Sequence, residues 1–341
     1  MNNHYSNYNV VSYDCNPFIF AKNILMDIVL LFLGISLLVI GGEFLVRSAV
    51  AISLKLNISK MIVGLTVVSF ATSVPELFVS LIAAFEEKAD FALGNVIGSN
   101  IANIGLVLAV TALINRLSTD KDFLRFYWPI MMLFSIGLYF MLSTNLDINA
   151  VEGFILLLAL IVYLLFLVIL NKSRKDIVLE EVDDSLKHAS YFKVVLWLAI
   201  GIAGLYFGSE WLVQGATGIA QSLGVSERVI SLTMVALGTS VPELAASIIA
   251  AIKKEKDLSL GNLIGSNIFN IGSVLGITAL IHPLNLQSEA MLNNDIIWMV
   301  AIAGILVPLA ILIPKRYTLF RIEGFILLVG YLAFVVLAFV N

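Results

Sequence analysis

A segment of 51 residues occurs twice in this chain, 167 positions apart, and this repeat limits the possible folds more than any other feature. Residues 64–114 align with residues 231–281 without a gap, and 31 of the 51 positions are identical. A bilayer would enforce apolar identity by itself, but the copies also share oxygen-bearing side chains and a proline: Thr72/Thr239, Ser73/Ser240, Pro75/Pro242, Glu76/Glu243, Ser99/Ser266, Asn100/Asn267 and Asn103/Asn270. The chain therefore has two similar halves, each with polar groups inside an apolar stretch.

The composition is that of a membrane protein. Hydrophobic residues make up 60% of the 341 residues, charged residues 13%, and the mean hydropathy is +0.99, whereas soluble domains are roughly half apolar and a quarter charged. We expect an all-α polytopic membrane protein with ten transmembrane helices, preceded by a polar tail over residues 1–23. The ten apolar runs are 25–54, 58–85, 91–114, 124–143, 149–170, 192–222, 226–252, 258–281, 294–314 and 320–340, and each meets or approaches the roughly 20 residues that a spanning helix needs.

The basic residues predict an orientation. If the N-terminus lies outside the cytoplasm, 16 of the 20 Lys and Arg residues fall in cytoplasmic loops, which is the usual bias. Because five spans per half is an odd number, the two repeats enter the membrane from opposite sides. We expect a first five-helix repeat (24–171), a charged cytoplasmic linker (172–191) and an inverted second repeat (192–341), in the cell membrane (plasma or inner) with both termini outside. Inverted repeats are typical of secondary transporters with a substrate site near the midplane.

The proline and glutamate of each repeat predict a cation site. Pro75 and Pro242 lack an N–H, so the second and seventh helices should break there and free backbone carbonyls. Glu76 and Glu243 follow directly, and an ionised carboxylate at that depth costs at least ~2.5–3.5 kcal/mol unless it meets a partner or water. The sequence offers no Lys or Arg at the same depth. An imported cation is therefore the expected counter-charge.

The GNxIGSNIxNIG segments of the third and eighth helices add further oxygens. Ser99 and Asn103 are four residues apart, as are Ser266 and Asn270, so each pair shares a helix face. The glycines permit close approach and local unwinding. We expect broken helices 2, 3, 7 and 8 around an all-oxygen site, which suits a hard cation such as Ca²⁺ or Na⁺.

Several other classes of function are excluded by what the chain lacks. The three histidines lie outside the predicted spans and Cys15 is the single cysteine, so no imidazole or thiolate metal site is expected within the membrane. No Asp or His lies in mid-span, which argues against an intramembrane protease or any other enzyme. A net charge of −4 gives no basis for nucleic-acid binding. A passive channel is disfavoured because its pore is usually built by subunit symmetry. Glu152 and Glu323 precede their spans and are expected to be interfacial anchors.

The doubled T-S-V-P-E and G-S-N-I-x-N motifs resemble the two signature repeats of the sodium/calcium exchanger family, within the cation/calcium antiporter superfamily, over residues 25–340. The resemblance implies an eight-helix core with four cation sites, and two long helices (25–54 and 192–222) that slide across it to alternate access. It also implies that Ca²⁺ and Na⁺ are transported substrates, with no cofactor. We expect the chain to work as a monomer in the lipid bilayer.

Carried over by motif, the implied side-chain ligands are Thr72, Ser73, Glu76, Ser99, Asn103, Thr239, Ser240, Glu243, Ser266 and Asn270, with Ser69 and Ala236 offering backbone carbonyls. Many sodium/calcium exchangers have an aspartate where this chain has Asn270, so the fixed charge here is −2. Electrogenic exchange of three Na⁺ for one Ca²⁺ remains possible by charge. A proton-coupled or K⁺-dependent exchanger would use the same glutamates, and the sequence does not separate these alternatives.

Overall fold

The computed structural model describes residues 17–119, 122–172, 184–225, 238–312 and 318–340. In these ranges the chain is a bundle of helices with two short two-stranded sheets. The first-half elements are α1 (Pro17–Leu56), α2 (Lys60–Val63), η1 (Gly64–Val68), α3 (Ser69–Thr72), α4 (Val74–Phe85), α5 (Ala89–Ala102), η2 (Asn103–Leu108), α6 (Ala109–Ile114), β1 (Leu117–Ser118), η3 (Phe123–Tyr127), α7 (Trp128–Asn145), β2 (Asp147–Ile148) and α8 (Ala150–Lys172). The others are α9 (Asp184–Lys187), α10 (Tyr191–Ser222), α13 (Val241–Ile252), α14 (Lys256–Phe269), η5 (Asn270–Leu275), α15 (Gly276–Ile281), β3 (Leu284–Asn285), η6 (Met291–Asp295), α16 (Ile296–Gly304), α17 (Leu306–Leu312), β4 (Thr318–Leu319) and α18 (Arg321–Val340).

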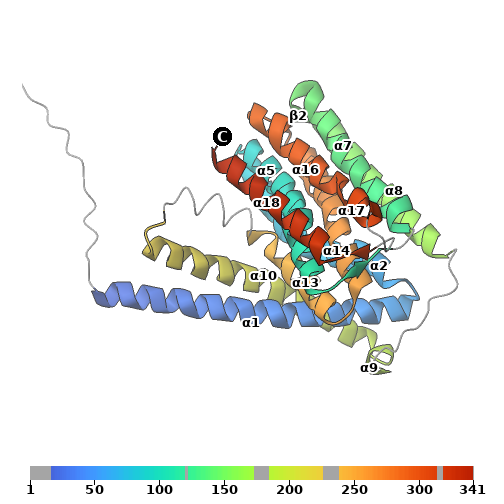
Figure 1. Ribbon diagram of the computed structural model, residues 1–341, viewed down its shortest axis with the longest axis horizontal. Helices are drawn as coiled ribbons and strands as arrows, with labels where there is room; N and C mark the ends of the chain where they lie inside the picture. Colours follow the sequence, from blue (N-terminus) through green and yellow to red (C-terminus); the bar gives the residue numbers. More distant parts are fainter. Residues whose placement is uncertain (1–16, 120–121, 173–183, 226–237, 313–317, 341) are drawn as a thin grey trace, which may run out of the picture.

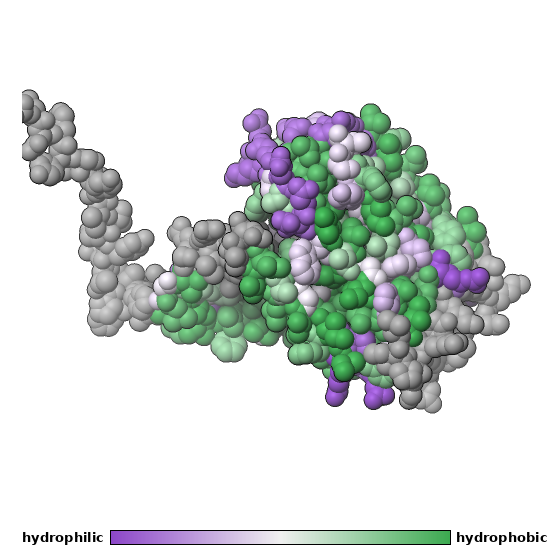
Figure 2. All heavy atoms as spheres, turned by 45° about the horizontal axis from the view of Figure 1, so that its top comes forward, coloured by the Kyte–Doolittle hydropathy of each residue, from purple (hydrophilic) through white to green (hydrophobic). Residues whose placement is uncertain are grey.

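Eight helical segments in the described ranges are long and apolar enough to cross a membrane, and a bent pair of helices makes up to nine. They match nine of the ten predicted spans within a few residues. The seventh predicted span, 226–252, lies in part outside the described residues, and its remainder is the 12-residue helix α13. Figure 2 shows hydrophilic residues gathered at the top of the molecule, with hydrophobic residues covering much of the helices below. The chain is a multi-pass membrane protein.

The two longest helices, α1 and α10, lie side by side along one edge of the bundle (Figure 1). Glycines bring their backbones together: a Cβ added to Gly41 would lie 2.6 Å from the Leu205 nitrogen, and one added to Gly208 would lie 2.8 Å from the Leu38 nitrogen. Gly41 and Gly208 are 167 positions apart, so the contact uses matched glycines from the two halves. The helices run antiparallel, because Gly34 meets Leu212 whereas Gly201 meets Leu45.

The repeated segments form the centre of the bundle. The segment that begins with α14 is the most buried of the candidate spans, followed by the segment that begins with α5. α14 packs on η1 through Gly64 and Gly261, where a Cβ on Gly64 would lie 2.6 Å from the Leu258 carbonyl oxygen. This close approach requires glycine and places the polar faces of the two halves against one another.

The chain bends at the first proline, as predicted. The helices 60–72 and 74–85 meet at an angle of 42° at Ser73, two residues before Pro75. The third and eighth predicted helices have a different local structure from the break that the sequence suggested. Each runs on continuously and widens into a π-helical segment, η2 or η5, that starts at Asn103 or Asn270. A π turn reshapes the backbone hydrogen bonding without ending the helix and is often found at functional sites.

Two strand pairs tie loops of the two halves together. β1 pairs with β4 in the register Leu117↔Leu319, and β2 pairs with β3 in the register Ile148↔Leu284. The glutamates that follow each strand pair accept hydrogen bonds at the starts of α8 and α18, and for Glu323 the structure corrects the expectation of an interfacial anchor. Glu152 Oε2 accepts from the Asn149 N–H at 2.9 Å, and Glu323 Oε2 accepts from the Phe320 N–H at 2.8 Å. Glu323 is fully buried, so its position reflects local hydrogen bonding and not contact with lipid headgroups.

Candidate cation site

Two glutamates occupy the first turns of matched helices. Glu76 lies in the first turn of α4 and Glu243 in the first turn of α13, each directly after a proline near the helix start. Pro is favoured there because its missing N–H would have had no partner. The N-terminal end of a helix carries partial positive charge, which favours a carboxylate at this place. Both side chains are fully buried.

Neither carboxylate has a charged partner of opposite sign in the described part of the chain, and the side chain of Glu243 has only the hydroxyls of Thr72 and Ser266 close by. None of the four carboxylate oxygens accepts a hydrogen bond there, and the ion pairs of the described residues involve other acids. Glu76 and Glu243 are close enough to interact electrostatically with each other. Two buried carboxylates without a counter-charge are costly, so the arrangement calls for a cation between them.

The asparagines of the central helices hold one another across the two halves. Asn103 Nδ2 donates to Asn267 Oδ1 at 3.1 Å, and Asn270 Nδ2 donates to Asn100 Oδ1 at 3.1 Å. These bonds use the amide nitrogens and leave Asn103 Oδ1 and Asn270 Oδ1 buried without a partner. The crossed contacts are the same from either half, so Asn270 is structurally equivalent to Asn103.

The unpartnered oxygens form a set that a cation can satisfy. The hydroxyl oxygens of Ser73 and Ser240 are also buried without a partner. With the four carboxylate and two amide oxygens, this makes eight orphaned oxygens from six residues, all at matched positions. Buried polar atoms are nearly always paired, and Ca²⁺ takes roughly 6–8 oxygens. All eight donors are oxygens, so they suit a hard ion.

The remaining predicted ligands lie in the same place but are hydrogen-bonded in this structure. Thr72 Oγ1 lies 3.3 Å from Ser266 Oγ, and Ser99 Oγ lies 3.1 Å from Thr239 Oγ1, so each threonine meets a serine of the other half. The Ser69 carbonyl accepts from the Ser73 N–H at 2.9 Å and from Thr72 Oγ1 at 3.4 Å. Ala236 lies outside the described residues.

The sequence analysis missed a second pair of asparagines. Asn95 Nδ2 donates to the Glu76 carbonyl and to Ser80 Oγ, and its Oδ1 accepts from Thr239 Oγ1. Asn262 makes matching contacts with Ser247 Oγ and Thr72 Oγ1. The signal was available, since Asn95 and Asn262 are identical polar positions of the repeat. They orient the threonines and serines around the glutamates.

A cavity of about 560 Å³ lies against the site from one side. Its walls include Pro75 and Thr239 of the repeats together with Glu210 and Gln214 of α10. Towards the other end of the molecule, Glu43 of α1 pairs with Lys253 at 2.7 Å, and Lys60 pairs with Glu255 at 2.6 Å. In this structure, therefore, a cavity reaches the ion site beside α10. At the other end, ion pairs connect α1 with Lys253 and α2 with Glu255.

Taken together, the fold and the site define a membrane transporter of cations, built from two halves that share one buried oxygen cluster. Comparison with known proteins leads to a narrower result. The family model described as sodium/calcium exchanger protein matches residues 26–169 and 193–340. The chain belongs to this sodium/calcium exchanger family and is not an enzyme.

Individual relatives agree with this assignment. The sodium/calcium exchanger MaX1 of Methanosarcina acetivorans is 32% identical over 352 residues, covering 93% of this chain and 99% of that protein. The inner membrane protein YrbG of Escherichia coli is 36% identical over 264 residues, covering 76% of this chain and 81% of that protein. A solved structure of the sodium-calcium exchanger NCX_Mj, soaked with zero Na⁺ and Ca²⁺, superposes with a TM-score of 0.78 at 30% identity and covers 91% of this chain and 98% of that one.

Proposed function

We propose that this chain is a secondary active antiporter that exchanges Na⁺ for Ca²⁺ across the membrane by alternating access. The observation that carries the proposal is the set of eight buried oxygens without partners, contributed equally by the two halves. Two of the six residues are carboxylates, so the set suits cations, and all the donors are hard oxygens.

In this proposal the glutamates are shared ligands. Glu76 and Glu243 hold Ca²⁺ together or are divided among Na⁺ ions, with Ser73, Ser240, Asn103 and Asn270 completing the coordination. The hydroxyls that pair across the halves become ligands when an ion displaces their mutual hydrogen bonds. The full proposed set is Thr72, Ser73, Glu76, Ser99, Asn103, Thr239, Ser240, Glu243, Ser266 and Asn270, with the carbonyls of Ser69 and Ala236.

The fixed charge supports electrogenic exchange. Two carboxylates balance one Ca²⁺, whereas three Na⁺ in the same site leave one net positive charge. A cycle that moves three Na⁺ one way and one Ca²⁺ the other way therefore transfers charge. Calcium extrusion driven by inward Na⁺ is the proposed direction.

The finer architecture that fits this function has ten spans in two inverted five-helix repeats, 24–171 and 192–341, joined by a cytoplasmic linker over 172–191 after a tail over 1–23. Both strand pairs support the topology, because ten spans place the loops of each pair on the same side of the membrane. With both termini outside the cell membrane, the cavity beside α10 faces outwards. The chain would act as a monomer, and α1 and α10 would slide across the core together.

The decisive experiment is ion flux in reconstituted vesicles. Ca²⁺ uptake should require an outwardly directed Na⁺ gradient, and its rate should respond to an imposed membrane potential if the exchange is electrogenic. Calcium uptake of the same rate without any Na⁺ gradient would reject Na⁺ coupling. Cysteines placed in the linker 172–191 should react only with reagents on the cytoplasmic side, which tests the orientation separately.

A second candidate is a calcium exchanger coupled to H⁺ or dependent on K⁺. The observation in its favour is Asn270, which leaves the site one carboxylate short of the family pattern that the motifs resemble. Flux measured while the Na⁺, K⁺ and pH gradients are clamped one at a time separates these cases. Uptake driven by a pH gradient alone would favour H⁺ coupling, and a requirement for K⁺ on the Na⁺ side would favour the K⁺-dependent form.

A further inference from the structure

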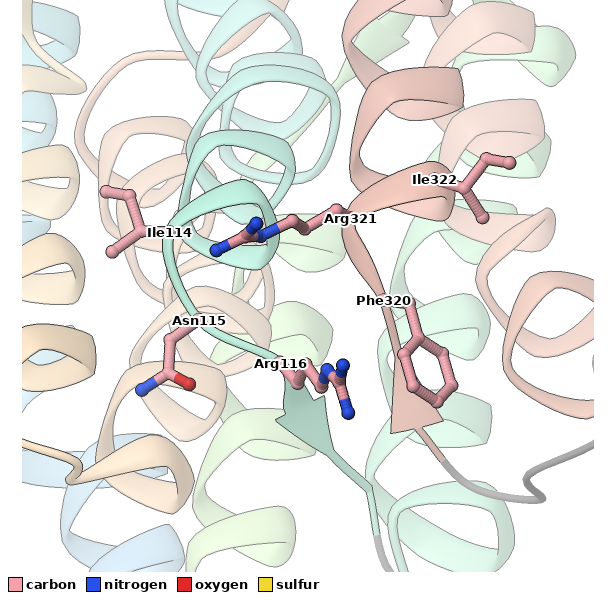
Figure 3. Close-up of a pocket in the computed structure, with 6 residues that line it drawn as sticks. All are labelled: Ile114, Asn115, Arg116, Phe320, Arg321 and Ile322. Atoms are coloured by element: carbon pink, nitrogen blue, oxygen red, sulfur yellow. The ribbon is translucent and has the colours of Figure 1, made fainter.

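A cavity remote from the ion site carries two arginines that have no acidic partner among the described residues. It has a volume of about 350 Å³ and lies between the end of α6 and the start of α18, lined by Ile114, Asn115, Arg116, Phe320, Arg321 and Ile322. Figure 3 shows Arg321 reaching from the start of α18 towards the end of α6, with Arg116 below it beside the Phe320 ring. The Arg116 guanidinium lies 5.3 Å from the centre of that ring. Neither arginine forms an ion pair with a carboxylate in the described part of the chain.

The backbone fixes these two charges near each other. β1 pairs with β4 in the register Ser118↔Thr318 and Leu117↔Leu319, and the same register places Arg116 opposite Phe320, next to Arg321. The Asn115 amide donates to the Ala251 carbonyl at 3.0 Å, which anchors the other wall. Two like charges held together in this way repel each other unless an anion lies between them.

The matched end of the molecule shows that the arginines are not required by the architecture. The strand β3 is the counterpart of β1 in the second half. The residue before β3 is Pro283, whereas the residue before β1 is Arg116. The first residue of α8 is Ala150, where α18 begins with Arg321. The basic pair is therefore an addition to one end only.

The starts of the matched helices α8 and α18 also differ, and again the difference favours an anion near α18. Asn149 Oδ1 caps α8 by accepting from the N–H groups of Val151 and Glu152, at 2.9 and 3.1 Å. Phe320 replaces that asparagine before α18 and has no acceptor, and no side chain in the described ranges accepts from the N–H groups of Ile322 or Glu323. A cation in the first turn of a helix is unfavourable, so Arg321 also fits its position better when an anion is present. An anion in the cavity would satisfy both the guanidinium groups and the open N–H groups.

We propose that this cavity binds the headgroup phosphate of an anionic phospholipid. A lipid is favoured over a soluble anion because exposed apolar residues adjoin the arginines: Ile114 is 41% exposed, Ile322 61% and Phe325 59%. They would lie along the acyl chains while the phosphate meets Arg116 and Arg321. Basic pockets between membrane helices on the cytoplasmic side are typical places for such headgroups, and the predicted orientation puts this cavity on that side. The proposal goes beyond ion exchange and does not depend on which ion is coupled.

The test uses full-length purified protein in detergent and three probes: phosphatidylglycerol, phosphatidylcholine and inorganic phosphate. Phosphatidylglycerol should raise the unfolding temperature of the wild type, and the other two should not. Its apparent affinity should fall about thirtyfold in the Arg116→Gln/Arg321→Gln variant. Arg125→Gln, an exposed arginine on the same predicted side but outside the cavity, is the matched control and should keep the wild-type affinity.

Two single changes keep the test informative if the double variant does not fold. Arg321→Ala copies Ala150 of the matched end and should weaken phosphatidylglycerol binding. Phe320→Asn copies Asn149, supplies the missing cap and should reduce the stabilisation that the lipid adds. Equal affinity in wild type and in all cavity variants would overturn the site, and an equal response to inorganic phosphate would show a soluble-anion site in place of a lipid site.

Discussion

The two halves of the molecule carry the same oxygens at the ion site but different charges where α1 and α10 meet the core. Glu43 of α1 accepts from Arg47 Nε at 2.6 Å and from Lys253 Nζ at 2.7 Å. The residues 167 positions from these three are Glu210 and Gln214 on α10 and Glu86 after α4. An attractive pair in one half thus corresponds to two acids in the other, and Lys88 is already paired with Glu86 at 2.7 Å.

The matched oxygens reflect what ion binding requires, whereas the unmatched charges on the long helices affect which access state is more stable. The ligands must serve the same ions from both sides, so they are matched residue by residue. In the proposed mechanism, the contacts between the long helices and the core would be made in one access state and broken in the other. Because Glu43 and Lys253 attract whereas Glu210 and Glu86 would repel, the two access states should differ in free energy.

The largest effect should come from removing the charge of one of the two matched glutamates, so that the two halves no longer contribute equally to the ion site. Glu76→Gln and Glu243→Gln each remove half of the fixed charge, so each should lower Na⁺-dependent Ca²⁺ flux in vesicles by more than about tenfold. Glu289→Gln is the control, because Glu289 is an exposed glutamate that contributes neither to the oxygen cluster nor to the contacts between the long helices and the core. If either site variant kept most of the wild-type flux, the two-carboxylate site would be wrong.

A second test compares the asparagines that hold one another. Asn103→Asp and Asn270→Asp each replace an amide N–H₂ donor with an oxygen, which then faces the Oδ1 of Asn267 or Asn100. A buried acceptor that loses its donor costs about 1–3 kcal/mol, so both variants should lower the flux by about tenfold and to a similar degree. Loss in one variant together with normal flux in the other would show that the two positions are not equivalent.

A third and smaller effect concerns the ion pair between α1 and the core. Lys253→Gln removes the attraction to Glu43, and since partly exposed pairs are worth about 0.2–1 kcal/mol, the ratio of the two access states should change by up to about fivefold. The measurement is the labelling rate of a cysteine placed at Gln214, beside the open cavity. Labelling should slow in Lys253→Gln, and Lys254→Gln should leave it unchanged. Unchanged labelling in both variants would mean that this ion pair does not affect the equilibrium.

The last effect should be on stability and not on transport, and it concerns the cap that distinguishes α8 from α18. Asn149→Ala removes the acceptor for two N–H groups and should lower stability by about 1 kcal/mol, read as a lower unfolding temperature in detergent. Asn145→Ala, at the end of α7, is the comparison variant. An equal loss of stability in both would show that the Asn149 cap has no special role.

Most of the spans and the residues of the buried oxygen cluster could be predicted because the bilayer and the repeat each constrain the sequence strongly. Span ends follow hydropathy, and matched polar residues such as Glu76 and Glu243 stand out inside apolar helices. The details that depend on contacts between distant residues could not be predicted. The crossed amides of Asn100 and Asn270, the supporting role of Asn95 and the π segment after Ala102 all depend on how the halves pack. The sequence analysis did not consider that Glu152 could accept a hydrogen bond from the backbone at the start of its own helix.

The close glycine contact between α1 and α10 would limit the leakage of ions through the protein. A side chain on Gly41 or Gly208 would collide with the facing backbone, so the two helices fit together in a single close arrangement and would travel as one body. One of them borders the open cavity and the other is paired to the core at the opposite end. A rigid pair cannot withdraw from both ends at once, so ions would never find a continuous path through the protein. Na⁺ would then flow down its gradient only when Ca²⁺ crosses the membrane in exchange.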